Sequence, residues 1–160
     1  MLRSIECGGI IVDENIEKLL VVYQRASRKW GLPKGHMNQN EISNNDKLTC
    51  SKREILEETG LNLNLTPNTV IGKENMNNKL FYIYKLGCSA ENLRLSPEDK
   101  NEILHVVWLN LETINKFINS NACNRSLREF NKRRLKIKKK MCKNDKNIMN
   151  NNFNVLTCEA

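Results

Sequence analysis

The first half of the chain consists of short apolar runs followed by one amphipathic stretch. Residues 5–12 and 19–23 are mostly apolar or β-branched and flank the polar sequence DENIEK, which predicts a β-hairpin. Residues 46–59 lack glycine and proline and carry apolar residues at helical spacing, so they predict a helix. Gly60 follows as a typical C-cap, where the helix should end.

The second half predicts further strands and a basic helix. Aromatic and β-branched residues indicate three strands: residues 69–72, 80–86 and 104–109. Asn110 is a favourable N-cap for a helix over residues 111–118. Residues 126–141 place apolar side chains at helical spacing, and the opposite face is nearly all Lys and Arg, which predicts a basic amphipathic helix.

Two tracts rich in Asn and Lys interrupt this pattern, near residues 38–47 and 142–152. Such tracts bury too little apolar surface to order themselves, so we expect mobile insertions in one domain that spans residues 1–160. The apolar residues 153–156 are expected to return to the core.

The composition narrows the possible functions. A chain of 160 residues, 39% of them hydrophobic, can fill one core. Its formal net charge of +8 favours polyanionic partners such as nucleotides, inositol phosphates, nucleic acid or an anionic membrane surface. No run approaches the roughly 20 apolar residues that cross a bilayer, so we expect a cytoplasmic or nuclear protein outside the membrane. The six cysteines lack metal-ligand spacing, which disfavours a zinc site.

The predicted helix 46–59 carries the sequence REILEETG. On a helix, Glu54, Glu57 and Glu58 fall within about 100° on one face, next to Arg53. Because carboxylates that lie so close repel each other, the cluster predicts a compensating cation, and hard oxygen ligands suit Mg²⁺ or Mn²⁺. The alternative interpretation is an acidic helix face exposed to solvent.

A wider spacing favours the metal site. Together with Gly35 and Glu41, the helix resembles the signature GX5EX7REUXEEXGU of the Nudix hydrolases. Eleven residues, 42–52, separate Glu41 from Arg53 where the family pattern has seven, so the sequence leaves open whether Glu41 still reaches Arg53. The resemblance implies an α/β fold, an α/β/α sandwich with a central mixed β-sheet, and metal-dependent attack of water on a phosphorus atom.

The resemblance also implies roles for individual residues. Arg53, Glu54, Glu58 and Glu102 are the expected catalytic residues, with either Glu54 or Glu102 as the general base. The metal ligands would be the backbone carbonyl of Lys34, in the sequence WGLPKGH, and four carboxylates: Glu54, Glu57, Glu58 and Glu102. Glu98 is the alternative to Glu102, and either of them could be an ordinary exposed loop carboxylate.

Four further segments resemble the asymmetrical diadenosine tetraphosphate hydrolases within this family: ECGGIIV, KWGLPKGH, RLS with EILHVVWLNLE, and FNVLTCEA. That resemblance implies hydrolysis of diadenosine tetraphosphate to ATP and AMP. It implies aromatic contacts with adenine, first from Tyr82 and then from Phe153, although aromatic residues of a strand equally often fill a core. Tyr84, two residues after Tyr82, shares its face of the strand and is expected to point the same way. The resemblance also implies phosphate contacts from three basic residues: Lys34, His36 and Lys79.

Other functions remain open from the sequence. The run KRRLKIKKK is compatible with a Nudix enzyme acting on RNA 5′ ends, and a diphosphoinositol phosphate is another possible substrate. A nucleotide-binding module without catalysis would have lost box residues, whereas this chain keeps them. We favour the dinucleotide over RNA as substrate, and expect a monomer.

Overall fold

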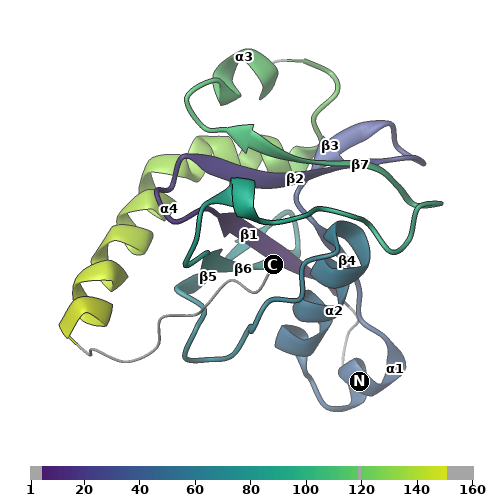
Figure 1. The fold of residues 1–160 in the computed structure, drawn as a ribbon. Coiled ribbons are helices and arrows are strands. Elements are labelled where there is room, and N and C mark those ends of the chain that lie inside the picture. Colours follow the sequence, from purple (N-terminus) through teal and green to yellow (C-terminus); the bar gives the residue numbers. More distant parts are fainter. Residues whose placement is uncertain (1–4, 119, 151–160) are drawn as a thin grey trace.

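A computed structural model describes residues 5–118 and 120–150, with side chains described as far as Lys143. Figure 1 shows a twisted β-sheet with helix α4 (Arg125–Asn150) on one face and helix α2 (Lys47–Thr59) on the other. The smaller helices α1 (Gln39–Ser43) and α3 (Ile114–Ile118) lie at opposite ends of the view. The predicted α/β architecture with helices on both faces of the sheet is therefore confirmed.

The sheet has seven strands: β1 (Glu6–Val12), β2 (Lys18–Gln24), β3 (Lys29–Gly31), β4 (Lys34–His36), β5 (Gly72–Met76), β6 (Lys79–Lys85) and β7 (Ile103–Asn110). Their order is β3-β2-β1-β6-β5, and β4 also pairs with β1 while β7 pairs with β2. Because β1 and β6 are parallel and the other pairs are antiparallel, the sheet is mixed, as expected. The predicted hairpin of residues 5–12 and 19–23 is confirmed as β1 and β2.

Alternate residues of the strands fill two separate cores. Ile10 and Val12 of β1 pack toward α4 with Phe130, whereas Ile11 packs toward α2 with Ile55. This is the two-residue period of a strand whose two faces are both covered. The alternation fixes which strand residues face α2 and its carboxylates.

Helix α4 confirms the predicted helix 126–141 and continues to Asn150, through most of the tract that we expected to be a mobile insertion. The continuation has a simple reason, because extending an existing helix costs much less than starting a new one. Not all cations of α4 point outward: the buried Glu74 of β5 accepts hydrogen bonds from Arg133 and Lys140. In the described part of the chain no helix combines the length and apolarity needed to span a bilayer.

Three other predictions were wrong in part. The strand expected over 69–72 begins at Gly72, because the Thr69 hydroxyl accepts the Thr66 N–H (2.8 Å) and closes a turn. Helix α3 is shorter than 111–118, because the Asn110 side chain accepts the Glu112 N–H (2.9 Å) in a turn that precedes it. The tract 38–47, which we expected to be a mobile insertion, contains helix α1 at Gln39–Ser43. Residues 153–156 lie outside the described residues.

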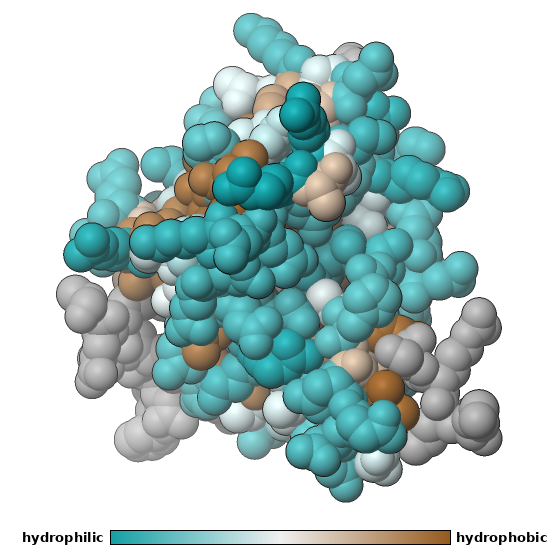
Figure 2. Space-filling view, turned by 90° about the vertical axis from the view of Figure 1, so that its right-hand side faces the viewer, coloured by the Kyte–Doolittle hydropathy of each residue, from teal (hydrophilic) through white to brown (hydrophobic). Residues whose placement is uncertain are grey.

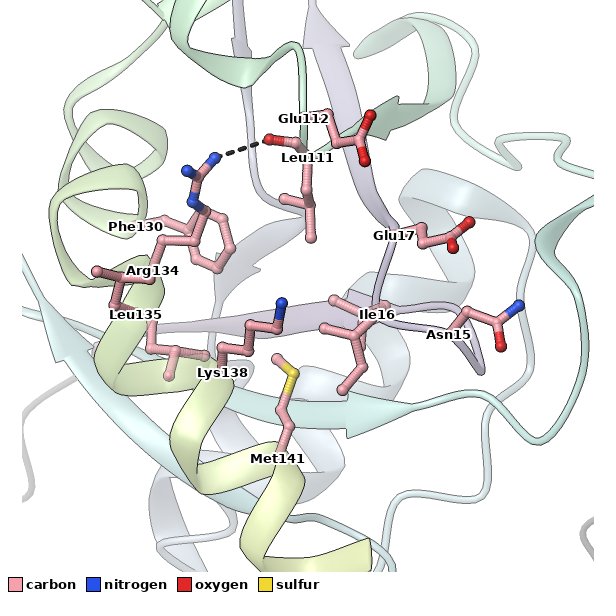
Figure 3. Close-up of a pocket in the computed structure, with 12 residues that line it drawn as sticks. Asn15, Ile16, Glu17, Leu111, Glu112, Phe130, Arg134, Leu135, Lys138 and Met141 are labelled. Atoms are coloured by element: carbon pink, nitrogen blue, oxygen red, sulfur yellow. Dashed lines mark hydrogen bonds between the residues drawn. The ribbon is translucent and has the colours of Figure 1, made fainter.

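A groove of about 360 Å³ lies between α4 and the turn that joins β1 to β2 (Figure 3). Ile16, Leu111 and Met141 contribute apolar surface to it, and the Arg134 guanidinium donates a hydrogen bond to the Leu111 carbonyl (2.7 Å). Leu135 is 72% exposed at its border. The groove is lined by two carboxylates, Glu17 and Glu112, and it contains none of the residues expected to be catalytic.

Replacing Gly60 by alanine should destabilise the protein by about 2–3 kcal/mol. Gly60 caps α2 with a φ of 80°, and a Cβ atom there would lie 2.2 Å from the Ser96 carbonyl oxygen. Urea unfolding followed by circular dichroism measures the loss. Gly72→Ala is the matched control, because its Cβ would meet no atom closer than 3.8 Å, and it should change stability by less than about 0.5 kcal/mol. Equal effects of the two substitutions would contradict this account of the cap.

Candidate active site

The sequence WGLPKGH contributes to two short strands, β3 and β4, that were not among the predicted strands. The pairing of β4 with β1 depends on Gly8, which lies opposite Lys34. A Cβ atom at Gly8 would lie 2.0 Å from the Pro33 carbonyl oxygen, so a larger residue would push β4 away. Strand β4 was missed because its pairing partner β1 is distant in sequence, and β3 was missed because only three residues pair with the preceding strand β2.

Gly35 brings the backbone of β4 against helix α2. A Cβ atom at this position would lie 2.1 Å from the Glu54 carboxyl carbon and within 2.4 Å of both its oxygens. The missing side chain therefore leaves the space that the Glu54 carboxylate occupies. This explains physically why the box motif needs a glycine here.

Arg53 holds the carboxylates of the site. Its Nη1 donates to Glu54 Oε1 (2.8 Å) and to Glu57 Oε2 (3.2 Å), and its Nη2 donates to the His36 carbonyl (2.9 Å). Arg53 also forms a bidentate ion pair with Glu41, in which Nε donates to Oε2 (3.0 Å) and Nη2 donates to Oε1 (2.8 Å). These contacts raise the pKa of Arg53, mainly through Glu41. Only the planar fork of arginine matches such a set of acceptors.

Glu41 does reach Arg53, which answers the question that the sequence left open. Its carboxylate is 4% exposed and also accepts the Asn38 N–H (2.9 Å), while the Asn38 side chain accepts the Glu41 N–H. This reciprocal capping box starts helix α1. Burial raises the pKa of Glu41, but the hydrogen bonds from Arg53 and Asn38 outweigh it and lower the pKa overall. The four extra residues are thus absorbed by a short helix that leaves the ion pair intact.

Glu58 is the most deeply buried carboxylate of the cluster. Its side chain accepts the Lys34 N–H on one oxygen (2.7 Å), and the other oxygen, Oε2, is buried without a hydrogen-bond partner. Burial, helped by the charges of Glu102 and Glu54, raises the pKa of Glu58 to about 8. A buried oxygen of this kind is energetically unfavourable unless something positive approaches it.

A divalent cation fits this set of donors. Burial raises the pKa of Glu54 despite the lowering effect of Arg53, and the charges of Glu57 and Glu102 add to the rise. Oxygen ligands that repel each other beside an unpartnered buried oxygen suit Mg²⁺ or Mn²⁺. Among the described side chains, no three His, Cys, Asp or Glu residues already converge on one point, because Arg53 holds Glu54 and Glu57. These two carboxylates would turn from Arg53 toward an ion.

The carboxylates face a cleft of about 390 Å³ at the edge strand β4. The lining residues come from five parts of the chain: Glu6, Gln24, Ala26, Lys34, Gly35, His36, Glu54, Glu57 and Glu102. Figure 2 looks at the side of the molecule where α1 and α2 lie in Figure 1, and this side is mainly hydrophilic. Glu102 lines the cleft, whereas Glu98 is exposed outside it and donates its backbone N–H to the backbone carbonyl of Glu57. The structure therefore brings together the expected carboxylates, with Glu102 rather than Glu98.

Of the expected aromatic contacts, the two described residues, Tyr82 and Tyr84, do not line the cleft. Tyr84 is 5% exposed and belongs to the core beneath α2 with Ile55, so its ring is not accessible to an adenine. Tyr82 is half-buried and packs against Met37 and Cys50. Phe153 lies outside the described residues.

Glu6 is a cleft residue that the sequence analysis missed. Its carboxylate lies 3.0 Å from Lys34 Nζ, 3.3 Å from Lys79 Nζ and 3.6 Å from His36 Nε2. The three residues expected to bind phosphate are therefore gathered around one acidic residue. A polar residue at the start of an apolar strand was the available signal, but only the pairing of β1 with β4 and β6 gives it meaning.

Comparisons with known proteins agree with this geometry. The chain is 31% identical over 111 residues to the m7GpppN-mRNA hydrolase of Saccharomyces cerevisiae, a match that covers 68% of this chain and 11% of that protein. It is 33% identical over 106 residues to the putative hydrolase 111R of Invertebrate iridescent virus 3, covering 66% of this chain and 58% of that protein. The chain thus spans only part of these curated relatives.

Among solved structures, the Ap4A hydrolase of C. elegans has a TM-score of 0.53 and 20% identity, over 78% of this chain and 94% of that one. Identity at this level supports the fold alone. The NUDIX domain model matches residues 4–129, which include every described residue that lines the cleft and the whole of α2. The chain therefore belongs to the Nudix family.

Proposed function

We propose that this chain is a metal-dependent Nudix pyrophosphohydrolase that cleaves a phosphoanhydride bond at the 5′ end of RNA. The observation that carries the proposal is its 31% identity to an m7GpppN-mRNA hydrolase. A match over 68% of a 160-residue chain must contain the middle of the chain, and so it includes Glu54, Glu57, Glu58 and Glu102. The likeness therefore extends over the proposed catalytic residues.

The residues of the cleft would have three roles: binding metal ions, positioning the carboxylates and accepting a proton. Glu57 and Glu58, with Glu102 and the Lys34 carbonyl, would hold the metal ions. Bound ions would neutralise phosphate oxygens and lower the pKa of the attacking water. Before an ion binds, Arg53 keeps Glu54 and Glu57 at the edge of the cleft through its hydrogen bonds. Either Glu54 or Glu102 would accept the proton of the water, since both line the cleft.

A row of cations on α4 supports RNA as the substrate. Six exposed basic residues recur every three or four positions and so share one face of the helix: Arg125, Arg128, Lys132, Lys136, Lys139 and Lys143. The start of α4 is tied to β3, because Asn124 donates its N–H to the Trp30 carbonyl (2.9 Å). The loop that leads into β3 lines the cleft with Ala26. The basic face therefore starts at the end of α4 that is anchored to β3, the strand that follows this loop.

Diadenosine tetraphosphate is the second candidate substrate. Lys34 and His36 line the same cleft as Glu54 and Glu57, an arrangement that suits a polyphosphate chain with several negative charges. The expected products are ATP and AMP. The role of Tyr82 in adenine binding stays a prediction.

A parallel assay separates the candidates. The full chain is incubated with Mg²⁺ and one of four substrates: capped RNA, triphosphorylated RNA, diadenosine tetraphosphate or a diphosphoinositol phosphate. Release of the cap nucleotide with kcat/KM at least about tenfold above the dinucleotide supports RNA as the substrate. Faster turnover of diadenosine tetraphosphate would favour the second candidate. Hydrolysis of none of them, with metal bound, would contradict both.

Neutralising the basic face of α4 should weaken RNA turnover selectively. The double variant Lys132→Gln/Lys136→Gln should raise KM for RNA about tenfold. It should also reduce the slope of log kcat/KM against log salt concentration by about two, since each lysine that contacts a phosphate releases about one counterion. Turnover of diadenosine tetraphosphate should stay within about twofold. The matched control is Lys73→Gln/Lys116→Gln, which removes two exposed lysines that do not belong to this face. An equal effect of the two double variants on RNA would argue against the basic face as a binding track.

A further inference from the structure

Glu6 occupies the position among the cations of the cleft that an anion would be expected to take. Its carboxylate contacts Lys34 Nζ and Lys79 Nζ and lies near His36 Nε2, at 3.0, 3.3 and 3.6 Å. The side chains of Glu6, Lys34 and Lys79 are 20%, 11% and 25% exposed, so these pairs are largely shielded from water. Ion pairs in such surroundings are screened less than pairs on an open surface.

The strand register produces this cluster. Glu6 lies directly opposite His36 of β4 on one side and Lys79 of β6 on the other. Lys34 is two residues before His36, so it points to the same face of the sheet. Glu54 contacts Gly35, whose position points to the other face. The cations and the catalytic carboxylates therefore approach the cleft from opposite sides of β4.

This arrangement creates a competition for the two ammonium groups. The Glu6 carboxylate lies 3.0 and 3.3 Å from the Lys34 and Lys79 ammonium groups, so its negative charge already faces the two cations that an incoming phosphate would contact. A phosphate group that approaches Lys34 meets this negative charge in the same cleft. Small polyanions with only this contact should bind weakly. A phosphate chain that is also held at the carboxylate cluster has a second attachment and can bind despite the repulsion.

We propose that Glu6 is a specificity-determining residue that screens Lys34 and Lys79, so that a phosphate group binds there only as part of a chain anchored at the carboxylate cluster. The inference rests on the proposed function for the identity of that chain. The recognised group is a non-reacting phosphate of the substrate. Glu6 itself takes no part in bond cleavage.

Inorganic tripolyphosphate is a suitable probe, because its binding can be measured by calorimetry without any turnover. Glu6→Gln should lower its dissociation constant about tenfold, since one like charge is removed a few ångströms from the anion. Glu91→Gln is the matched control: Glu91 is 80% exposed and pairs with Lys18, at the other end of β2. This control should leave the dissociation constant unchanged within about twofold.

A second variant tests the same idea in the presence of Glu6. Lys79→Gln should weaken tripolyphosphate binding by about threefold or more. The negative charge of Glu6 is then compensated by one ammonium group fewer, so it repels the phosphate more strongly. An unchanged or weaker affinity in Glu6→Gln, or an unchanged affinity in Lys79→Gln, would overturn the proposal. Failure of the proposed function would instead appear as absence of turnover with all substrates, while these binding differences persisted.

Discussion

Replacing Glu58 by glutamine should reduce turnover about a thousandfold at saturating Mg²⁺. Glu58 is 1% exposed, one of its oxygens accepts the Lys34 N–H, and the other is the unpartnered buried atom of the cluster. Glutamine keeps the shape and the acceptor for Lys34 but removes the negative charge that would hold a metal ion. The measurement is kcat with the preferred substrate over a range of magnesium concentrations. Equal turnover of the two proteins would defeat the metal assignment.

The same substitution should stabilise the metal-free protein at high pH. Glu58 has a folded-state pKa of about 8, above the ordinary value of 4.5, so between these values the folded state binds more protons than the unfolded state. Stability must then fall as the pH rises from about 4.5 to about 8. Glu58→Gln removes this dependence, so its advantage should grow from nearly zero at pH 4.5 to on the order of 3–5 kcal/mol above pH 8.

Urea unfolding in the presence of a chelator, at pH 5 and pH 9, measures this difference. Added Mg²⁺ should stabilise wild type more than Glu58→Gln at pH 9, because an ion that binds only the folded state adds to its stability. A variant that was less stable than wild type at pH 9 without metal would show that the charge of Glu58 is compensated by the protein itself. Together with the turnover assay, this separates loss of metal binding from loss of folding.

Local spacing in the sequence was sufficient to predict helix α2 and its acidic face. The helix has regular periodicity, and Gly60 ends it at the expected position with a left-handed φ. Helix α1 could not be predicted in the same way, since its five residues form around one capping box and the ion pair of Glu41 with Arg53. A segment that is stabilised mainly by one tertiary contact gives almost no periodic signal.

The site was predicted where one helix supplies its residues and was missed where several strands meet. Helical spacing places Glu54, Glu57 and Glu58 on one face, and the wider spacing to Gly35 and Glu41 favoured a metal site there. Glu6 becomes visible only when β4 and β6 are placed on either side of β1, which requires the register of the whole sheet. Tyr84 was misjudged because an alternating strand pattern cannot tell which positions α2 covers, and α2 covers Tyr84.

Replacing Gly35 by alanine should reduce turnover about a hundredfold while changing the free energy of unfolding by less than about 1 kcal/mol. The added methyl group would lie 2.1 Å from the Glu54 carboxyl carbon, so the carboxylate must move. Stability should be spared, because the atoms that must give way are the end of a flexible side chain. Of the described glycines, only Gly60 has a positive φ, so alanine at position 35 also causes no backbone strain. Measuring kcat and urea unfolding on the same preparation tests both halves of the expectation.

A double-substitution cycle identifies the route of this effect. If Gly35→Ala acts by displacing the Glu54 carboxylate, it should lower kcat by little more than about twofold when it is introduced into Glu54→Gln, because that negative charge is already absent. Full additivity of the two losses would mean that Gly35 acts on something else, such as the backbone carbonyls of β4. The Gly35 carbonyl lies 3.7 Å from Cys50 Sγ and the His36 carbonyl accepts from Arg53, so a shift of β4 would disturb the site even with Glu54 neutralised. The cycle therefore distinguishes a glycine that makes room for one carboxylate from a glycine that sets the path of the strand.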